Sequence, residues 1–198
     1  MNNESKPNGL SEKDKLDFIF SNIQDARNNI LERVKQREIS LIFYLGAVST
    51  IVGVAFNNET SNENILLLIP FLSLGITLLI SFHNSMMNSL SEYIVNELEP
   101  EIRKLGVKTS IWDTSKAMSY VTKRASRFRV SGFLFLILFP PIFSLIMNFS
   151  YINVWQILSL WIIGIFCVII SSVIYISTVN KRWKFHSKIF IDEEIEEK

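Results

Sequence analysis

Four long stretches of this chain carry no charged side chain and are rich in Ile, Leu, Phe and Val. They cover Ile39–Phe56, Ile65–Phe82, Val130–Met147 and Val154–Ile176. A helix needs roughly 20 apolar residues, and about 17 at least, to cross the hydrocarbon core of a bilayer. The sequence therefore predicts an all-α integral membrane protein with four transmembrane helices.

The predicted spans leave no large independent soluble domain. Short turns, Asn57–Asn64 and Asn148–Asn153, join the spans in two pairs. The expected organisation is an amphipathic helix over 1–38, a transmembrane hairpin over 39–82, a helical segment over 83–129, a second hairpin over 130–176 and a tail over 177–198.

The 20 Lys and Arg residues all lie outside the spans and outside both short turns. Because basic residues stay on the cytoplasmic side of a membrane, this pattern predicts that both termini and the segment 83–129 are cytoplasmic. Tyr151 and Trp155 are placed as aromatic anchors at the outer interface. The polar, charged first 38 residues argue against a cleavable signal peptide, and we expect a multi-pass membrane protein.

Helical periodicity continues beyond the first span toward the N-terminus. Ser11 with Asp14 is typical of a helix start, and no Gly or Pro interrupts the residues from there to Ile39, so we expect a nearly continuous helix over Glu12–Phe56. Its apolar face is formed by residues spaced three and four apart: Leu16, Ile19, Ile23, Ala26, Ile30 and Val34.

The second span is expected to continue in the same way, with Gly106 as its stop and Pro100 as a kink or interruption. A helix restarting near Asp113 or Thr114 would lead into the third span. The apolar stripe after the second span consists of Met87, Leu90, Ile94, Leu98, Ile102 and Leu105. The apolar stripe before the third span consists of Ala117, Val121, Ala125 and Phe128. A weaker apolar stripe after the fourth span consists of Val179, Trp183, His186 and Ile189. Such faces must be buried, so the extensions are predicted to form a cytoplasmic bundle, either within one chain or between subunits.

The spans contain no Asp, Glu, Lys, Arg or His. Intramembrane ionisable groups mark proton relays and ion sites, so their absence argues against a proton-coupled transporter, a pump or an intramembrane protease. Small residues at four-residue spacing favour close helix–helix contact, whether within or between chains. The candidate packing residues are Gly46, Thr50 and Gly53 in the first span and Gly164, Cys167 and Ser171 in the fourth.

Two consecutive prolines, Pro140 and Pro141, lie in the middle of the third span. They remove two helix donors and should bend or open the helix, either as a static kink or as a hinge. Pro70, near the start of the second span, costs little because donors there are unpaired in any case.

No catalytic or cofactor motif is present. His83 and His186 are too few and too isolated for a metal site, and Cys167 has no partner for a disulfide. The chain contains no phosphate-binding glycine loop, GxSxG, HExxH or CxxC. We therefore expect no enzyme activity, no metal and no cofactor.

Two basic clusters flank the second hairpin: Lys123, Arg124, Arg127 and Arg129 before it, and Lys181, Arg182, Lys184 and Lys188 after it. Juxtamembrane basic residues attract anionic lipid, so these side chains are candidates for lipid or partner contact. Nucleic acid is not expected, since no aromatic stacking pattern accompanies them. The acidic tail Asp192–Glu197 is expected to be solvated and mobile.

This layout of amphipathic cytoplasmic helices, paired spans and tiny outer turns resembles small membrane proteins of bacterial antiphage systems. It is similar to two- and four-span effectors encoded beside nucleotide-second-messenger synthases, and to the membrane accessory proteins of type VI-B CRISPR nucleases. The resemblance lies in architecture alone and assigns no residue a role. It implies an oligomeric effector or regulator that permeabilises the membrane or modulates a nuclease. The alternative is a membrane anchor or scaffold that docks a soluble partner through its cytoplasmic helices.

Overall fold

The computed structural model describes residues 11–57, 63–107, 116–151 and 154–196; side chains are described for residues 11–57, 63–107, 130–150 and 154–181. Within these ranges the chain is helical, and four helices are long and apolar enough to cross a membrane. These are Glu12–Ala55, Glu63–Lys104, Val130–Ser150 and Trp155–Lys181. The protein is an all-α, multi-pass membrane protein, and the predicted fold class is confirmed.

Helix α1 (Glu12–Ala55) is a single helix of 44 residues, as its sequence predicts. The Ser11 side chain accepts a hydrogen bond from the Asp14 backbone N–H at 3.2 Å, and Asp14 accepts one from the Ser11 N–H at 3.3 Å. This reciprocal capping box satisfies two amide donors that a helix start leaves unpaired. The residues after it are free of Gly and Pro as far as Leu45, so nothing ends the helix before it reaches the apolar stretch.

The second span comprises a 3-10 turn η1 (Glu63–Leu68) and helix α2 (Ile69–Tyr93). A π-helical turn η2 (Ile94–Leu98) and helix α3 (Glu99–Lys104) follow without a break. Sequence analysis predicted a kink or an interruption at Pro100; in the structure the π turn ends two residues before Pro100 and the helix continues through it. A π turn widens the helix locally, which relieves the clash between a proline ring and the preceding carbonyls.

Gly106 ends α3, as predicted. Its φ of +75° lies in the left-handed region that favours glycine. The Gly106 N–H donates to Arg103 O at 3.0 Å, and the Val107 N–H donates to Ile102 O at 3.4 Å. These two bonds form a Schellman motif, which satisfies the last carbonyls of the helix.

Helix α4 (Lys116–Met147) continues through Pro140 and Pro141 and ends in a 3-10 turn, η4 (Asn148–Tyr151). Helix α5 (Trp155–Glu196) has 42 residues, so the acidic tail is helical as far as Glu196 and is not an irregular extension. The predicted restart near Asp113 or Thr114 lies outside the described residues, as do the side chains of the stripe after Lys116.

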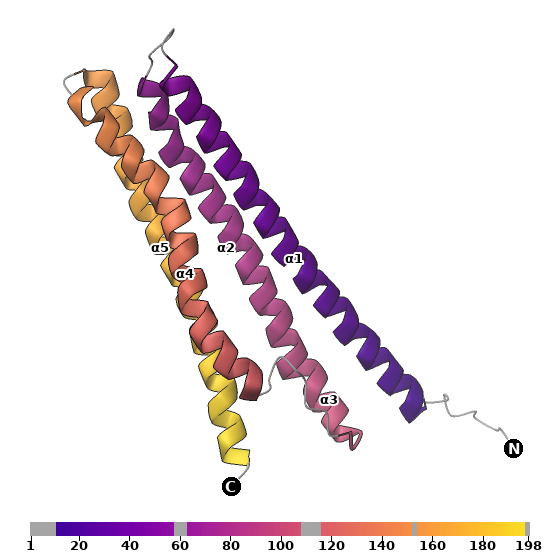
Figure 1. The fold of residues 1–198 in the computed structure, drawn as a ribbon. Helices are drawn as coiled ribbons and strands as arrows, with labels where there is room; N and C mark the ends of the chain where they lie inside the picture. Colours follow the sequence, from indigo (N-terminus) through magenta and orange to yellow (C-terminus); the bar gives the residue numbers. More distant parts are fainter. Residues whose placement is uncertain (1–10, 58–62, 108–115, 152–153, 197–198) are drawn as a thin grey trace, which may run out of the picture.

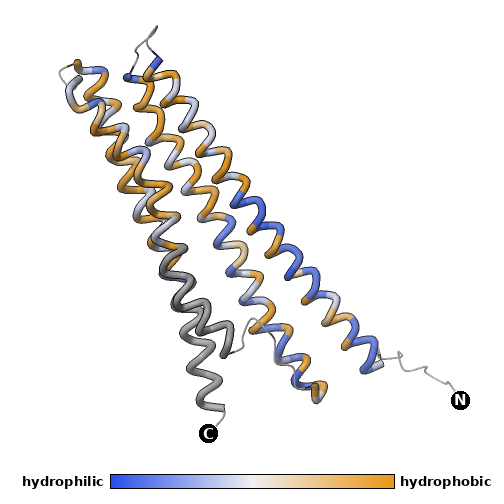
Figure 2. Tube along the Cα trace, in the orientation of Figure 1, coloured by the Kyte–Doolittle hydropathy of each residue, from blue (hydrophilic) through white to orange (hydrophobic). Residues whose placement is uncertain are grey.

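Helix α2 occupies the centre of the molecule, between α1 on one side and the α4–α5 pair on the other (Figure 1). The end of α1, the turns η1 and η4, and the start of α5 lie at one end, which we call the turn end. The start of α1, α3 and the end of α5 lie at the other end, which we call the polar end. The apolar residues gather toward the turn end, and hydrophilic residues become frequent on α1 toward its N-terminus (Figure 2).

The helices bury two apolar cores. The larger core joins all four long helices near the turn end and includes Tyr44, Ile69, Ile80, Ile137 and Tyr175. The smaller core packs α1 against η2 and α3 at the polar end, and consists of Ile23, Ala26, Ile94, Leu98 and Ile102. All five residues of the smaller core belong to the predicted apolar stripes, so on this side of the molecule the bundle forms within one chain.

Candidate functional site

A buried polar cluster lies where the apolar part of α1 begins. Arg37 is only 6% exposed, although it lies two residues before the first uncharged stretch. Its Nη1 donates to Asn84 Oδ1 on α2 at 3.2 Å, and its guanidinium lies 5.1 Å from the centroid of the Phe133 ring on α4. Glu38 is 4.0 Å from its Nη2. One buried cation on α1 thus contacts two other helices, α2 through a hydrogen bond and α4 through a cation–π contact.

His83, the first residue after the predicted second span, belongs to the same cluster. It is buried, and its Nδ1 has no hydrogen-bond partner among the described residues. Burial, followed by the charges of Arg33 and Arg37, lowers the pKa of His83 below its ordinary value.

A second polar contact lies deeper, halfway along the spans. The Tyr44 hydroxyl on α1 is 2.6 Å from Ser73 Oγ on α2. The same hydroxyl donates to the Ile137 carbonyl of α4 at 3.4 Å. Because a tyrosine has one hydroxyl hydrogen, this arrangement makes Ser73 the donor to Tyr44 and Tyr44 the donor to Ile137.

At the turn end, polar side chains tie α4 to the neighbouring helices. Ser144 Oγ donates to Leu66 O at 2.5 Å, and Asn148 Nδ2 donates to Glu63 O at 3.3 Å. Trp161 Nε1 on α5 donates to Leu145 O at 2.9 Å. These bonds hold the last turn of α4 against both η1 and α5.

The predicted packing residues of the two spans have opposite environments. Gly164, Cys167 and Ser171 are buried on α5, and a Cβ added to Gly164 would lie 2.9 Å from Leu145 Cδ2. Gly46, Thr50 and Gly53 are exposed on α1, and nothing lies within 4 Å of a Cβ added to either glycine. The small residues of α5 therefore allow close packing within the chain, whereas those of α1 do not face a helix of the same chain.

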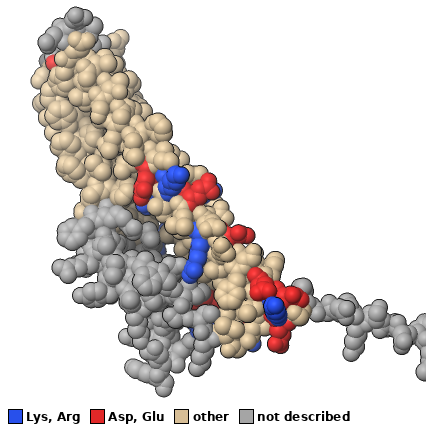
Figure 3. All heavy atoms as spheres, turned by 45° about the vertical axis from the view of Figure 1, so that its right-hand side comes forward, with Lys and Arg blue, Asp and Glu red and all other residues tan. Residues whose placement is uncertain are grey.

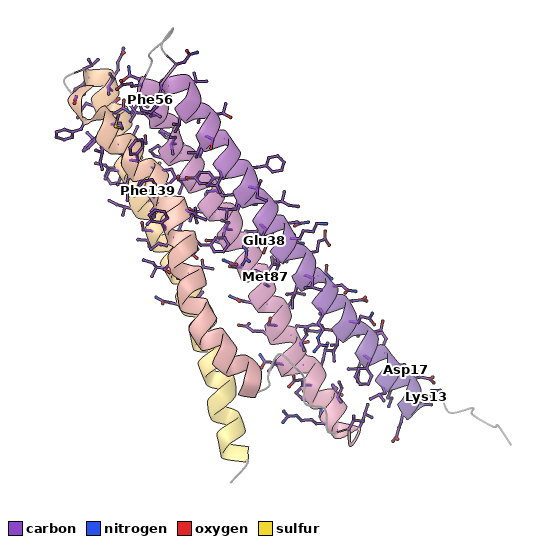
Figure 4. All side chains as sticks on the ribbon, viewed as in Figure 1. Lys13, Asp17, Glu38, Phe56, Met87 and Phe139 are labelled. Carbon is purple, nitrogen blue, oxygen red and sulfur yellow. The ribbon has the colours of Figure 1, made fainter. Side chains whose placement is uncertain are left out.

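The predicted hinge residues lie inside α4. Pro141 is fully buried, and Pro140 is half-buried beside it. Phe135, Phe139 and Phe143 stack along the outer side of the helix across the prolines, with ring centroids 5.0 and 6.2 Å apart. Phe139 points away from the bundle (Figure 4).

Of the predicted basic clusters, Lys181 is exposed on α5. The side chains of Lys123, Arg124, Arg127, Arg129, Arg182, Lys184 and Lys188 lie outside the described residues. The charged side chains that are described gather toward the polar end, and the surface nearer the turn end is mostly free of them (Figure 3).

Among the described residues, no group of three or more His, Cys, Asp or Glu side chains is placed to hold a metal ion. Sequence analysis missed the roles of Arg37, Tyr44 and Asn84. Arg37 and Tyr44 are seven residues apart, which is about two helical turns, and this spacing is the sequence signal that both side chains lie on the same face of α1.

Searches with this chain against protein-family models, curated proteins and solved structures found no match.

Proposed function

We propose that this chain is a non-enzymatic protein of a bacterial inner membrane that forms oligomers and acts as an effector or regulator of antiphage defence. Both termini and the segment 83–129 are cytoplasmic in this proposal, in accord with the distribution of basic residues. The protein acts by permeabilising the membrane or by modulating a nuclease, as the architectural resemblance implies.

The observation that carries the proposal is the uncovered face of α1. Gly46, Thr50 and Gly53 share one side of the helix and lie opposite the buried residues Tyr44 and Val48. Helices associate in lipid chiefly by close van der Waals packing, for which small residues are suited. Open space beside both glycines supports a neighbouring subunit as the element that packs there.

Charge-free spans fit an effector better than a transporter. The interhelical contacts within the spans are made by hydroxyl, amide and indole groups, as at Tyr44, Ser144 and Trp161. Such groups offer no titratable site for coupling transport to protons. An assembly of several copies can instead disturb the bilayer by rearranging its helices.

Gly46→Leu tests this proposal against Gly132→Leu, since Gly132 on α4 also has nothing within 4 Å of an added Cβ. We expect Gly46→Leu to reduce cross-linked oligomers in the membrane and to abolish the loss of membrane potential during phage infection. Gly132→Leu should leave both unchanged. Unaltered membrane potential and phage survival on expression of the unmodified protein would refute the effector proposal.

A scaffold function is the second candidate, favoured by apolar side chains on the part of α1 that precedes the span. Phe20 is 43% exposed and Leu31 is 66% exposed. Eleven residues separate them, which is about three helical turns and places both on one side of α1. This pair is suited to docking a soluble partner.

Replacing Phe20 and Leu31 together with Ser distinguishes the scaffold from the effector. Phe18→Ser is the matched control, because Phe18 is 66% exposed on another side of the helix. The scaffold predicts that the double variant loses a co-purifying partner and that Phe18→Ser keeps it. Charge reversal of Lys123, Arg124 and Arg127 should weaken the same capture if the basic cluster contributes to docking.

A further inference from the structure

Pro141 faces a hydroxyl group from another helix at the carbonyl that it leaves unpaired. In an α-helix the N–H of residue i donates to the carbonyl of residue i−4, and proline has no N–H. Pro141 therefore leaves the Ile137 carbonyl without its helical donor, and Tyr44 donates to that carbonyl. At the turn end, Ser144 donates to the Leu66 carbonyl of the 3-10 turn η1.

The two hydrogen bonds from a hydroxyl group to a carbonyl of another helix differ in length. Ser144 Oγ lies 2.5 Å from Leu66 O, whereas Tyr44 Oη lies 3.4 Å from Ile137 O. All four residues are buried. An unsatisfied carbonyl in hydrocarbon is costly, so both bonds have a role, but the longer one is the weaker.

The bonds of α4 fall into two groups, one on each side of Pro140–Pro141. Residues 144–148 are fixed at the turn end by the Ser144 and Asn148 side chains and by Trp161. The contacts described between residue 130 and the prolines include two longer hydrogen bonds, Tyr44 Oη to Ile137 O at 3.4 Å and Tyr175 Oη to Val130 O at 3.5 Å. They also include the guanidinium of Arg37 over the Phe133 ring.

From this asymmetry we propose that Tyr44 is a latch for a hinge in α4. While Tyr44 donates to Ile137, α4 stays against α1; when the bond breaks, the part of α4 before Pro140 bends away and residues 144–148 stay in place. The bond also links α1 to α4 directly, so a shift of α1 along its axis would break it. This inference does not depend on the proposed function, because its readout is a distance within one chain.

The experiment measures two distances by electron paramagnetic resonance in lipid nanodiscs. The Cys167→Ala background receives spin labels at exposed positions Leu79 and Phe135 for the moving part, or Leu68 and Ile146 for the fixed part. Dilution with unlabelled protein removes distances between copies. Tyr44→Phe, which deletes only the hydroxyl, should broaden the first distance distribution or add a longer component, and leave the second unchanged.

Pro141→Ala supplies the matched background, since it restores a backbone N–H to Ile137. We expect Tyr44→Phe to have little effect in that background, and Ser73→Ala to have little effect with Pro141 present. Should Tyr44→Phe fail to give folded protein, Pro141→Ala alone still tests the hinge, because it should narrow the first distribution. An unchanged first distance in Tyr44→Phe, an equal change with and without Pro141, or equal broadening of both pairs would overturn the proposal.

Discussion

Neutral polar side chains make the interhelical hydrogen bonds of the spans. Ser144, Asn148 and Trp161 each donate to a carbonyl on another helix or at the end of α4. Lipid offers no competing water, yet such bonds contribute only about 0.6–2 kcal/mol each in measured membrane proteins. Each bond therefore contributes little to the free energy of unfolding. Together, because each lies at a defined position, the bonds fix the register of the helices.

Replacing Ser144 with Ala should lower the free energy of unfolding by about 1 kcal/mol, because the buried hydrogen bond from α4 to the Leu66 carbonyl is lost. Ser159→Ala is the control, since Ser159 is exposed and its hydroxyl bonds only the nearby Gln156 carbonyl at 2.8 Å. Thermal or denaturant unfolding in detergent measures both. Equal destabilisation by the two substitutions would show that the interhelical bond has no special contribution.

Hydroxyl groups in a helix can bond a carbonyl of the preceding turn, and those of Thr50, Thr77 and Ser172 do so. The Ser144 hydroxyl instead donates to the Leu66 carbonyl in η1. Nothing in the local sequence of Ser144 distinguishes it from the others. Its partner is set by how far α4 is shifted along η1, which depends on packing across the whole molecule.

At the scale of elements, each end of the molecule is packed around its own apolar core. The larger core joins the four long helices near the turn end, and the smaller core attaches α3 to the N-terminal half of α1. Ile102 is fully buried in the smaller core. The short helix α3 is held by this contact and by the Schellman motif at Gly106.

Ile102→Ala should therefore release α3 without unfolding the spans. Removing a large buried side chain costs about 2–5 kcal/mol, which is borne here by a small local core. Hydrogen exchange should increase in α3 and around Ile23, and remain unchanged near Ile137. Phe18→Ala, at an exposed position on α1, should change exchange in neither region.

Helix positions followed from the sequence because composition and periodicity are local properties. The start of α1 at Ser11 and the end of α3 at Gly106 are both as predicted. The π turn before Pro100 was not predicted, because a proline can be accommodated by a kink, a break or a wider turn with similar local chemistry. The choice among them depends on how α3 packs against α1.

At the scale of the whole molecule, α2 is the helix on which the others pack. In the most apolar 18-residue stretch of the second span, 50% is buried, against 17–22% in the corresponding stretches of the other three spans. The outer faces of α1, α4 and α5 are correspondingly apolar and exposed, as at Phe43, Phe135 and Phe166. Lipid, or further copies of the chain, must cover these faces.

Cysteine labelling checks the topology that the basic residues predict. In a Cys167→Ala background, Glu12→Cys and Lys104→Cys should react with an impermeant reagent only after the cells are opened. Asn64→Cys, in the turn between the first two spans, should react in intact cells. Labelling of Lys104→Cys from outside would show that the polar end does not face the cytoplasm.

The unbroken course of α1 has a mechanical consequence. A helix of 44 residues rises about 1.5 Å per residue, so α1 is about 65 Å long. This one continuous helix connects its capped start at Ser11 to the interior of the membrane. It has no loop or glycine before Gly46 that could absorb a displacement. A binding partner that displaces α1 at Phe20 would therefore move the whole helix. The displacement would be transmitted along α1 to the contacts of Arg37 and Tyr44.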